Sequence, residues 1–183
     1  MILANTVSTS SNDTAHAGIV NLGTIQGTTG SIEVDSVGGH GIYSNAGKFD
    51  LASIKVTNAG LNTAMIGIYL DGGSNMKATT ISVNNTGKQG IQLQHVNTLT
   101  ANTVTIENTV KNGLRLYNKN GNPTVTIGTL KTINCDQCGV AADQQEITDA
   151  NLNISAMWYK NCGTVLHANI KSGVATPQEI TEQ

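Results

Sequence analysis

The chain has 183 residues, enough for one ordinary domain, and a formal net charge of -2, which gives no electrostatic reason to expect nucleic acid or an anionic membrane as partner. Charged residues make up 12% and aromatic residues 3%, so a globular core of the usual kind would lack large apolar side chains. No stretch approaches the roughly 20 apolar residues that span a bilayer, and no export signal is visible. We therefore expect no nucleic-acid partner, no membrane insertion, and either disorder or a thin, repetitive β architecture.

Residues 1–17, rich in serine, threonine and asparagine, are predicted to form a leader or a partial coil. From residue 18 to 166 a short motif recurs, in which a glycine precedes an apolar residue, a variable residue and usually a second apolar residue. These glycines are separated by 23 to 26 residues and are Gly18, Gly41, Gly67, Gly90, Gly113, Gly139 and Gly163. A self-similar period of this length marks a solenoid, whose units bury their apolar faces only by stacking on neighbours.

Each unit also carries two further alternating segments, rich in the β-branched residues and threonine that favour strands. These segments are Phe49/Leu51 with Ile54/Val56, Met76/Ala78 with Ile81/Val83, Leu99/Ala101 with Val104/Ile106, and Val125/Ile127 with Leu130/Thr132. No unit contains ten or more residues at helical spacing. The sequence thus predicts an all-β fold, a right-handed parallel β-helix of about six to seven coils with three short strands per coil.

The alternation also predicts which side chains point into the coil. The first and third residues after each glycine should face inward and the second outward. The inward residues should form one interior file of Ile42, Ile68, Ile91 and Leu114. The outward position should form one exposed stripe of Tyr43, Tyr69, Gln92 and Arg115. Aromatic faces beside amide and guanidinium groups suit contact with a sugar or a protein surface.

An asparagine recurs near the end of each unit. The column comprises Asn58, Asn85, Asn108 and Asn134, with Asn161 as its next member. Stacked side-chain amides at equivalent corners can donate to one another, so we predict a structural asparagine ladder. The alternative is that asparagine serves here only as a common turn residue. Because Asn58 lies farther from the next glycine than its equivalents do, residues 59–66 are predicted to form a longer corner loop.

Chemistry-bearing residues were sought four positions after each glycine, where the sequence has Asn45, Asp71, Gln94, Tyr117, Asp143 and His167. Asp71 and Asp143 lie three coils apart, on the order of 14 Å, whereas glycosidase carboxylate pairs need about 5 to 9.5 Å. We therefore assign no catalytic residue. A looser group on the same side could frame a groove: Asp71, His95, Arg115, Tyr117 and Asp143. The four histidines (His16, His40, His95 and His167) fall at different registers, so we expect no metal and no cofactor.

Three cysteines fall within the last two units. Cys138 and Cys162 each stand immediately before a repeat glycine, so their Cα atoms should be about 4.8 Å apart, within the range for a disulfide. Cys135 with Cys138 is the competing pair. Zinc would need a fourth ligand, and a thioredoxin-type motif needs a βαβ setting. We expect one disulfide that stiffens the C-terminal coils and one free thiol.

Together the unit length, the Gly-apolar-x-apolar strand and the asparagine corner, over about residues 18–166, resemble the pectin-lyase-like right-handed β-helix superfamily. That superfamily includes bacterial autotransporter passenger domains and other large surface adhesins. The resemblance specifies the fold better than the function. Its polysaccharide-cutting members are lyases with clustered acids and an arginine or lysine base, or hydrolases with grouped aspartates. The sequence departs from both patterns, and its one arginine is Arg115.

The resemblance implies a non-enzymatic extracellular module of a bacterial adhesin or autotransporter passenger, at the cell surface and part of a larger exported protein. It would serve as a rigid scaffold and bind a host glycan or protein through Tyr43, Tyr69, Gln92, Arg115, Asp71, His95 and Tyr117. The alternative is a carbohydrate-active β-helix, such as a polysaccharide lyase, a hydrolase or a phage tailspike piece. A third hypothesis is an assembly protein that self-associates through its ends, because residues 167–183 read as a polar tail and provide no clear cap.

Overall fold

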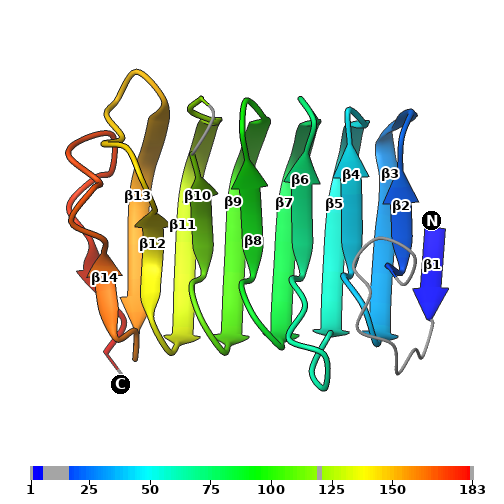
Figure 1. Cartoon of the computed structure of the whole chain (residues 1–183), viewed down its shortest axis with the longest axis horizontal. Helices are drawn as coiled ribbons and strands as arrows, with labels where there is room; N and C mark the ends of the chain where they lie inside the picture. The colour runs from blue at the N-terminus through cyan, green and yellow to red at the C-terminus, as the bar shows by residue number, and fades with distance from the viewer. Residues whose placement is uncertain (1, 6–16, 119–120, 182–183) are drawn as a thin grey trace.

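The computed structural model describes residues 2–5, 17–118 and 121–181, which form a β-solenoid of about six turns (Figure 1). The eight-stranded sheet contains, in order, β1 (Ile2–Asn5), β3 (Thr24–Val37), β5 (Lys48–Ala59), β7 (Asn75–Thr86), β9 (Thr98–Thr109), β11 (Thr124–Cys135), β13 (Leu152–Lys160) and β15 (Gln178–Glu179). The seven-stranded sheet contains β2 (Ile19–Asn21), β4 (Ile42–Asn45), β6 (Ile68–Asp71), β8 (Ile91–Gln94), β10 (Leu114–Tyr117), β12 (Cys138–Ala142) and β14 (Thr164–Leu166). All neighbouring strands are parallel, which confirms the predicted parallel β-helix.

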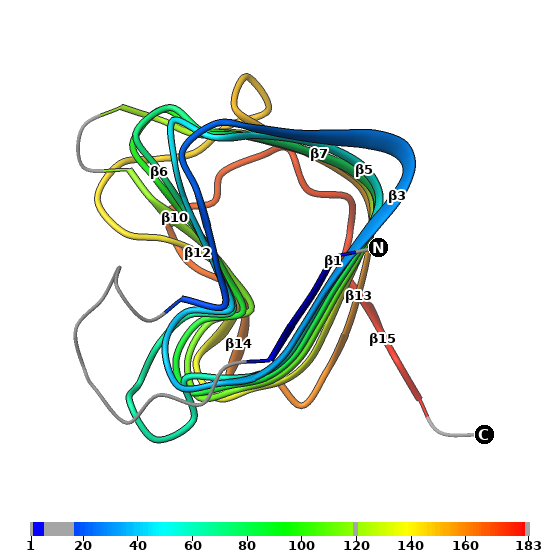
Figure 2. The same ribbon diagram turned by 90° about the vertical axis from the view of Figure 1, so that its right-hand side faces the viewer.

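A typical coil contributes one short and one long strand, where the sequence predicted three short strands. The two further alternating segments predicted in each unit are the two halves of one continuous strand. This strand bends around the coil in the view along its axis (Figure 2). Between β5 and β7 the paired positions skip one residue, from Leu51 opposite Ala78 to Ser53 opposite Thr80. Pairing with the neighbouring coil resumes directly after the bend, so the strand turns without ending.

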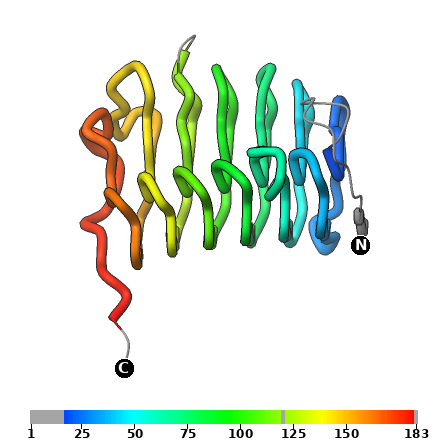
Figure 3. Tube along the Cα trace, turned by 60° about the horizontal axis from the view of Figure 1, so that its bottom comes forward, coloured from blue at the N-terminus to red at the C-terminus, as the bar shows by residue number. Residues whose placement is uncertain are grey.

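The interior contains the predicted file of apolar side chains. Ile68 lies opposite Ile42 on one side and Ile91 on the other, and Leu114 lies opposite Ile91. All four side chains are completely buried. The common register of successive coils is thus confirmed, and the columns of the sequence are physical rows of side chains. The tube view of Figure 3 shows the coils lying on one another along the axis.

The register differs from the prediction in the last coil. Cys138 lies opposite Thr164 and Val140 opposite Leu166, which puts Val165 opposite Gly139. Gly163 therefore does not belong to the glycine column, and its backbone nitrogen instead donates to the carbonyl oxygen of Cys135 at 3.1 Å. Gly163, followed after Thr164 by Val165 and Leu166, imitates the motif in sequence, but the backbone hydrogen bonds of this coil select a register two residues later.

The asparagine column occupies one corner of the coil. The backbone of Asn58, Asn85, Asn108, Asn134 and Asn161 is left-handed, with φ between 50° and 60°. Asn85 Nδ2 donates to Asn58 Oδ1 at 2.7 Å, and Asn134 Nδ2 donates to Asn108 Oδ1 at 2.8 Å. Asn161 continues the second run by donating to Asn134 at 3.1 Å. Asparagine thus does two things at this corner. It tolerates the left-handed backbone, and its side chain forms hydrogen bonds between coils.

The asparagine rows form two runs. Asn108 donates to Asn84 at 2.8 Å and not to Asn85. At the other end, Asn58 donates to the carboxylate of Asp35 at 2.9 Å. The loop after Asn58 contains a turn over residues 61–64, where the sequence predicted a longer corner. The exchange at Asn84 shows that either of two consecutive asparagines can supply the oxygen.

We expect Asn108→Ala to lower the free energy of unfolding by about 2 kcal/mol, because it removes two exposed hydrogen bonds and places a Cβ-bearing residue without a local hydrogen bond at φ 54°. Asn108→Gly tolerates this φ and should cost about 1 kcal/mol. Urea unfolding followed by circular dichroism compares the two variants. Unchanged unfolding midpoints in both would show that the row of amides contributes no stability.

The C-terminal segment follows the stack further than predicted. Residues 167–183 were expected to form a polar tail, yet Ile170 pairs with Ile147 and Val174 with Ile154. The strand β15 then pairs with β13, with Gln178 opposite Trp158. At the other end, β1 belongs to the predicted leader and pairs with β3. Most of the leader lies outside the described residues. In the described part of the chain, no helix has the length and apolar character needed to cross a bilayer.

Candidate functional site: the face of the seven-stranded sheet

The outward side of the seven-stranded sheet, here called the short-strand face, gathers most of the predicted site residues. Its side chains come from the second and fourth positions after each glycine of the motif and from the residue before it. Tyr69 and Asp71 lie on β6, and Arg115 and Tyr117 lie on β10. Because the coils share one register, each of these positions becomes a row that crosses several coils.

The predicted stripe of Tyr43, Tyr69, Gln92 and Arg115 is one such row. The strand register places Tyr69 between Tyr43 and Gln92, and Arg115 on the far side of Gln92. The rings of Tyr43 and Tyr69 meet edge to face, with centroids 5.4 Å apart. Arg115 Nη1 donates to Gln92 Oε1 at 3.0 Å. The row is therefore held together by aromatic packing at one end and by a charge-assisted hydrogen bond at the other.

This row is not the exposed stripe that the sequence predicted. Tyr43 is 8% and Gln92 6% exposed, whereas Tyr69 and Arg115 are half-buried. His40, which precedes Gly41, covers the tyrosine end, with its ring 5.2 Å from that of Tyr69. Its Nδ1 accepts a hydrogen bond from the backbone nitrogen of Ile66 at 3.1 Å. An outward direction therefore did not mean exposure, because His40 packs against the two tyrosines and Arg115 bonds to Gln92.

Arg115 is the centre of a compact charged cluster. Its Nε donates to Asp143 Oδ1 at 3.0 Å, and its Nη2 contacts the second carboxylate oxygen of Asp143. Its guanidinium carbon lies 5.1 Å from the centroid of the Tyr117 ring. The bidentate pair and the aromatic face fix the guanidinium in one orientation. Arg115 is thus a fixed hydrogen-bond donor that links Asp143 to Gln92.

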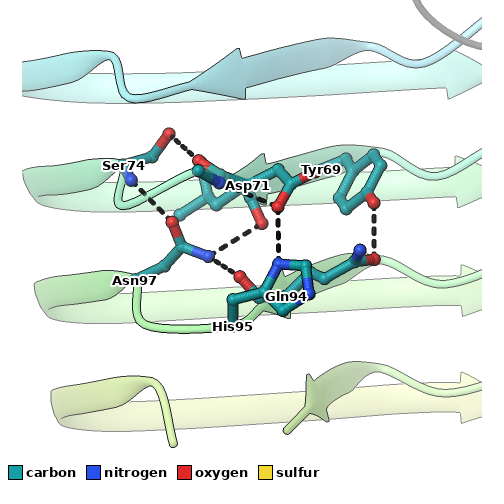
Figure 4. A network of polar contacts seen from close by, with 8 residues as sticks. Tyr69, Asp71, Ser74, Gln94, His95 and Asn97 are labelled. Atoms are coloured by element: carbon teal, nitrogen blue, oxygen red, sulfur yellow. Dashed lines mark hydrogen bonds and ion pairs between the residues drawn. The ribbon is translucent and has the colours of Figure 1, made fainter. Parts of the chain in front are cut away.

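Asp71 and His95 form a second polar cluster, shown in Figure 4. His95 Nδ1 lies 2.9 Å from Asp71 Oδ1, which also accepts a hydrogen bond from the backbone nitrogen of Gly72 at 2.8 Å. Beside this pair, the Tyr69 hydroxyl donates to Gln94 Oε1 at 2.5 Å. The carboxylate thus orients the imidazole at the edge of the short-strand face.

A buried asparagine holds this edge in place. Asn97 Oδ1 accepts a hydrogen bond from the backbone nitrogen of Ser74 at 2.6 Å, and its Nδ2 donates to the carbonyl oxygens of Leu70, at 3.2 Å, and Gln94. The Ser74 hydroxyl in turn donates to the carbonyl oxygen of Asp71 at 2.6 Å. The turns after β6 and β8 are therefore tied to each other, and they carry the Asp71 and His95 pair (Figure 4).

The structure does not join the two clusters. Asp71 and Arg115 lie two coils apart, on the order of 10 Å, and within the described side chains no hydrogen bond or ion pair connects them. His167, predicted in the same row as Asp143, is not opposite it, because Leu166 pairs with Val140 in the last coil. His16 is outside the described residues. Among those described, no three His, Cys, Asp or Glu side chains gather as metal ligands.

A pocket of about 290 Å³ opens beside the Arg115 cluster. Its lining includes Gln89, Lys111, Asn112, Arg115, Asp143 and His167. Gln89 is 1% exposed, and its Oε1 is buried without a hydrogen-bond partner. Most buried polar atoms are paired, so an orphaned acceptor in the lining of a pocket requires an explanation.

The sequence reasoning missed Gln89, Lys111 and Asn112, although a signal for two of them was present. The residue directly before each glycine also recurs in register, and in four coils it is polar: His40, Gln89, Asn112 and Cys138. This position was used for the cysteines alone. The row formed by the residues directly before the glycines lies along the border of the short-strand face. It supplies amide, imidazole and thiol groups.

The cysteines are also arranged differently from the prediction. All three are free thiols, and Cys138 lies opposite Thr164 rather than next to Cys162. The predicted pairing relied on Gly163 belonging to the glycine column, which the register contradicts. Cys138 lines the pocket, its backbone nitrogen donates to Asn112 Oδ1 at 3.1 Å, and burial raises the pKa of its thiol.

Comparison of the chain with protein-family models, with curated proteins and with solved structures gives no match.

Proposed function

We propose that the chain is a non-enzymatic extracellular binding module, in which a rigid β-helix presents a carbohydrate-binding site on its short-strand face. The continuous stack of coils supports the role of scaffold, because each coil fixes the position of the next. The resemblance of the repeat to adhesins and autotransporter passengers supports a place at a bacterial surface, within a larger exported protein. A host surface glycan is the partner that this arrangement suits best.

The observation that carries this proposal is the unpartnered Oε1 of Gln89 in the lining of the pocket. Leaving a buried acceptor without a donor costs about 1 to 3 kcal/mol, which a ligand hydroxyl would recover once the Gln89 side chain turns its amide into the pocket. Lys111 and the Arg115 and Asp143 pair line the same pocket. A saccharide offers hydroxyl groups that donate to Gln89 and accept from these cations, so its chemistry matches the lining.

The part of the Tyr69 ring that His40 leaves exposed supplies the apolar part of such a site. Tyr69 is half-buried and stands on the same side of the sheet as Gln92 and Arg115, two coils from the pocket. Carbohydrate rings have apolar faces that pack on aromatic side chains, while their hydroxyls bond to amides and charged groups. We therefore place an extended oligosaccharide across the coils, from Tyr69 towards the pocket.

Binding to an array of neutral and acidic oligosaccharides, followed by titration calorimetry with the retained sugars, tests this function. We expect Gln89→Met and Lys111→Ala to weaken binding at least tenfold, because they remove an acceptor and a cation from the pocket. Lys131→Ala, on the exposed face of β11, removes the same charge elsewhere and should leave the affinity unchanged. Failure of every array sugar to bind, or equal affinities in all variants, would refute the proposed site.

A catalytic function is the second candidate, favoured by the 2.9 Å contact between Asp71 and His95. An imidazole oriented by a carboxylate is a common arrangement for a general base. Incubation with polygalacturonate and mixed glycans, with detection of shortened products, tests it. Product formation that disappears in Asp71→Ala and Arg115→Ala would establish an enzyme and displace the binding module.

A further inference from the structure

The register of the last coils brings two cysteines together that the sequence did not pair. In the pairing of β11 with β13, Ile133 lies opposite Lys160, and the same register places Cys135 opposite Cys162. Each cysteine directly follows a left-handed asparagine, Asn134 with φ 52° and Asn161 with φ 50°. The chain therefore enters both cysteines with the same backbone conformation, and their side chains leave the two coils in the same direction.

This arrangement has the dimensions of a disulfide. Neighbouring parallel strands run about 4.8 Å apart, and disulfides join Cα atoms about 4.4 to 6.8 Å apart. The coils are also hydrogen-bonded at this point, because the nitrogen of Gly163 donates to the carbonyl oxygen of Cys135. A covalent bond between the two sulfurs would thus need no change of register.

The surroundings of the two thiols differ. Cys135 is completely buried, whereas Cys162 is half-buried, with its Sγ 3.7 Å from Thr132 Oγ1. A hydrogen bond from the Cys135 thiol lowers the pKa of Cys162 to about 6, with a further contribution from the Thr132 hydroxyl and against the effect of burial. The same contact, with burial, raises the pKa of Cys135. Cys162 is therefore the more acidic thiol of the pair and the less buried residue.

We propose that Cys135 and Cys162 form an oxidisable dithiol site, which a hydroperoxide converts into a disulfide that joins the last two full coils. In the first step the Cys162 thiolate attacks a peroxide oxygen, the O–O bond breaks, and with one proton from solvent an alcohol or water leaves. In the second step Cys135 Sγ attacks the Cys162 sulfenic acid. The S–O bond breaks, and the hydroxide leaves as water with the Cys135 proton. Two thiols thus lose two electrons to one peroxide.

The site is independent of the proposed carbohydrate function, because it lies at the corner after β11 and β13, and neither Cys135 nor Cys162 lines the pocket. Cys138 is the natural control. It lies opposite Thr164, lines the pocket, and has a thiol pKa that burial raises. A weakly ionised thiol in another row should not replace Cys135 as the resolving residue.

Titration of the folded chain with stoichiometric hydrogen peroxide, then thiol counting in denaturant and intact mass, tests the proposal. We expect the wild-type count to fall from three to one, with the loss of two hydrogens in mass. Cys138→Ser should fall from two to none, and Cys162→Ser should keep two. Cys135→Ser should fall from two to one and gain one oxygen in mass, because its Cys162 sulfenic acid has no resolving thiol. A wild-type count that stays at three, or loss of both thiols in Cys135→Ser, would overturn the pairing.

The reactivity of Cys162 gives a second readout that does not depend on the folding of a variant. Iodoacetamide alkylates thiolates, so its reaction with the folded wild-type chain should be near its maximum at pH 7 and should fall as the pH drops below about 6. Lys160 precedes Cys162, so trypsin places the labelled cysteine on a different peptide from Cys135 and Cys138. First labelling of the peptide that holds Cys135 and Cys138 would contradict the assignment of the thiolate.

Discussion

Ile91→Ala is expected to lower the free energy of unfolding by about 3 to 4 kcal/mol, the largest effect that we predict for this chain. Ile91 is completely buried in the middle of the interior file, with Ile68 opposite it in one neighbouring coil and Leu114 in the other. Truncation removes contacts with both neighbours and leaves a cavity that the rigid coils cannot close. At this chain length the melting temperature should fall by roughly 10 °C.

Urea and thermal unfolding, followed by circular dichroism, measure this effect. Val96→Ala is the matched control, because Val96 is 62% exposed and lies on the same coil, just after β8. It should change the free energy of unfolding by less than about 0.5 kcal/mol. If Ile91→Ala and Val96→Ala unfolded at the same urea concentration, the stacked interior file would not be the source of stability.

Gly90→Ala should lower the free energy of unfolding by about 2 to 3 kcal/mol, although it adds a single methyl group. A Cβ at this position would meet Ile106 Cγ2 at 2.2 Å and the carbonyl oxygen of Gly113 at 2.9 Å. The first contact is with the core and the second with the backbone of the next coil. The carbonyl cannot give way without loosening its 2.9 Å hydrogen bond from the Ile91 nitrogen, and Ile106 is completely buried in the core.

Gly23→Ala separates this steric effect from the general effect of replacing glycine. A Cβ on Gly23 would meet no atom within 4 Å, and the residue has no positive φ. The substitution should therefore leave the stability unchanged or raise it by a few tenths of a kcal/mol. The two variants carry the same chemical change, so their difference in urea midpoint reports the packing of the glycine column. Similar midpoints would show that the column is tolerant of side chains.

The sequence predicted which residues of the site share a row, but it did not predict which side chains contact one another. The spacing of the glycines placed Tyr69, Gln92 and Arg115 in one row, and the strand register agrees. It did not reveal that His40 covers the tyrosine end or that Asp143 binds Arg115 through both oxygens. Such contacts depend on rotamers and on the paths of the turns, which are not periodic. The position before the glycine, which contains Gln89, recurs with the same spacing and could have been predicted as a row in the same way.

The cysteine pairing is a second feature that residue spacing could not predict. Residue spacing alone made Gly163 an equivalent of Gly139 and so paired Cys138 with Cys162. Relative to the preceding coil, the turn between β12 and β13 is one residue longer and the corner between β13 and β14 is one residue shorter, so the two sheets continue with different offsets into the last coil. Spacing between glycines cannot show at which corner the extra residues are inserted. Only the hydrogen-bonded register assigns Cys135 to Cys162.

The sequence by itself determined the parallel β-helix, the direction of the apolar side chains and the columns of glycine and asparagine. These features follow from a two-residue alternation and from a repeat, both of which are local and survive without knowledge of the turns. Only the tertiary structure decided which outward side chains are covered, how the last coil is registered and which polar groups share a pocket. The reason is physical: burial and pairing across coils depend on the turns, whose lengths and rotamers differ from one coil to the next.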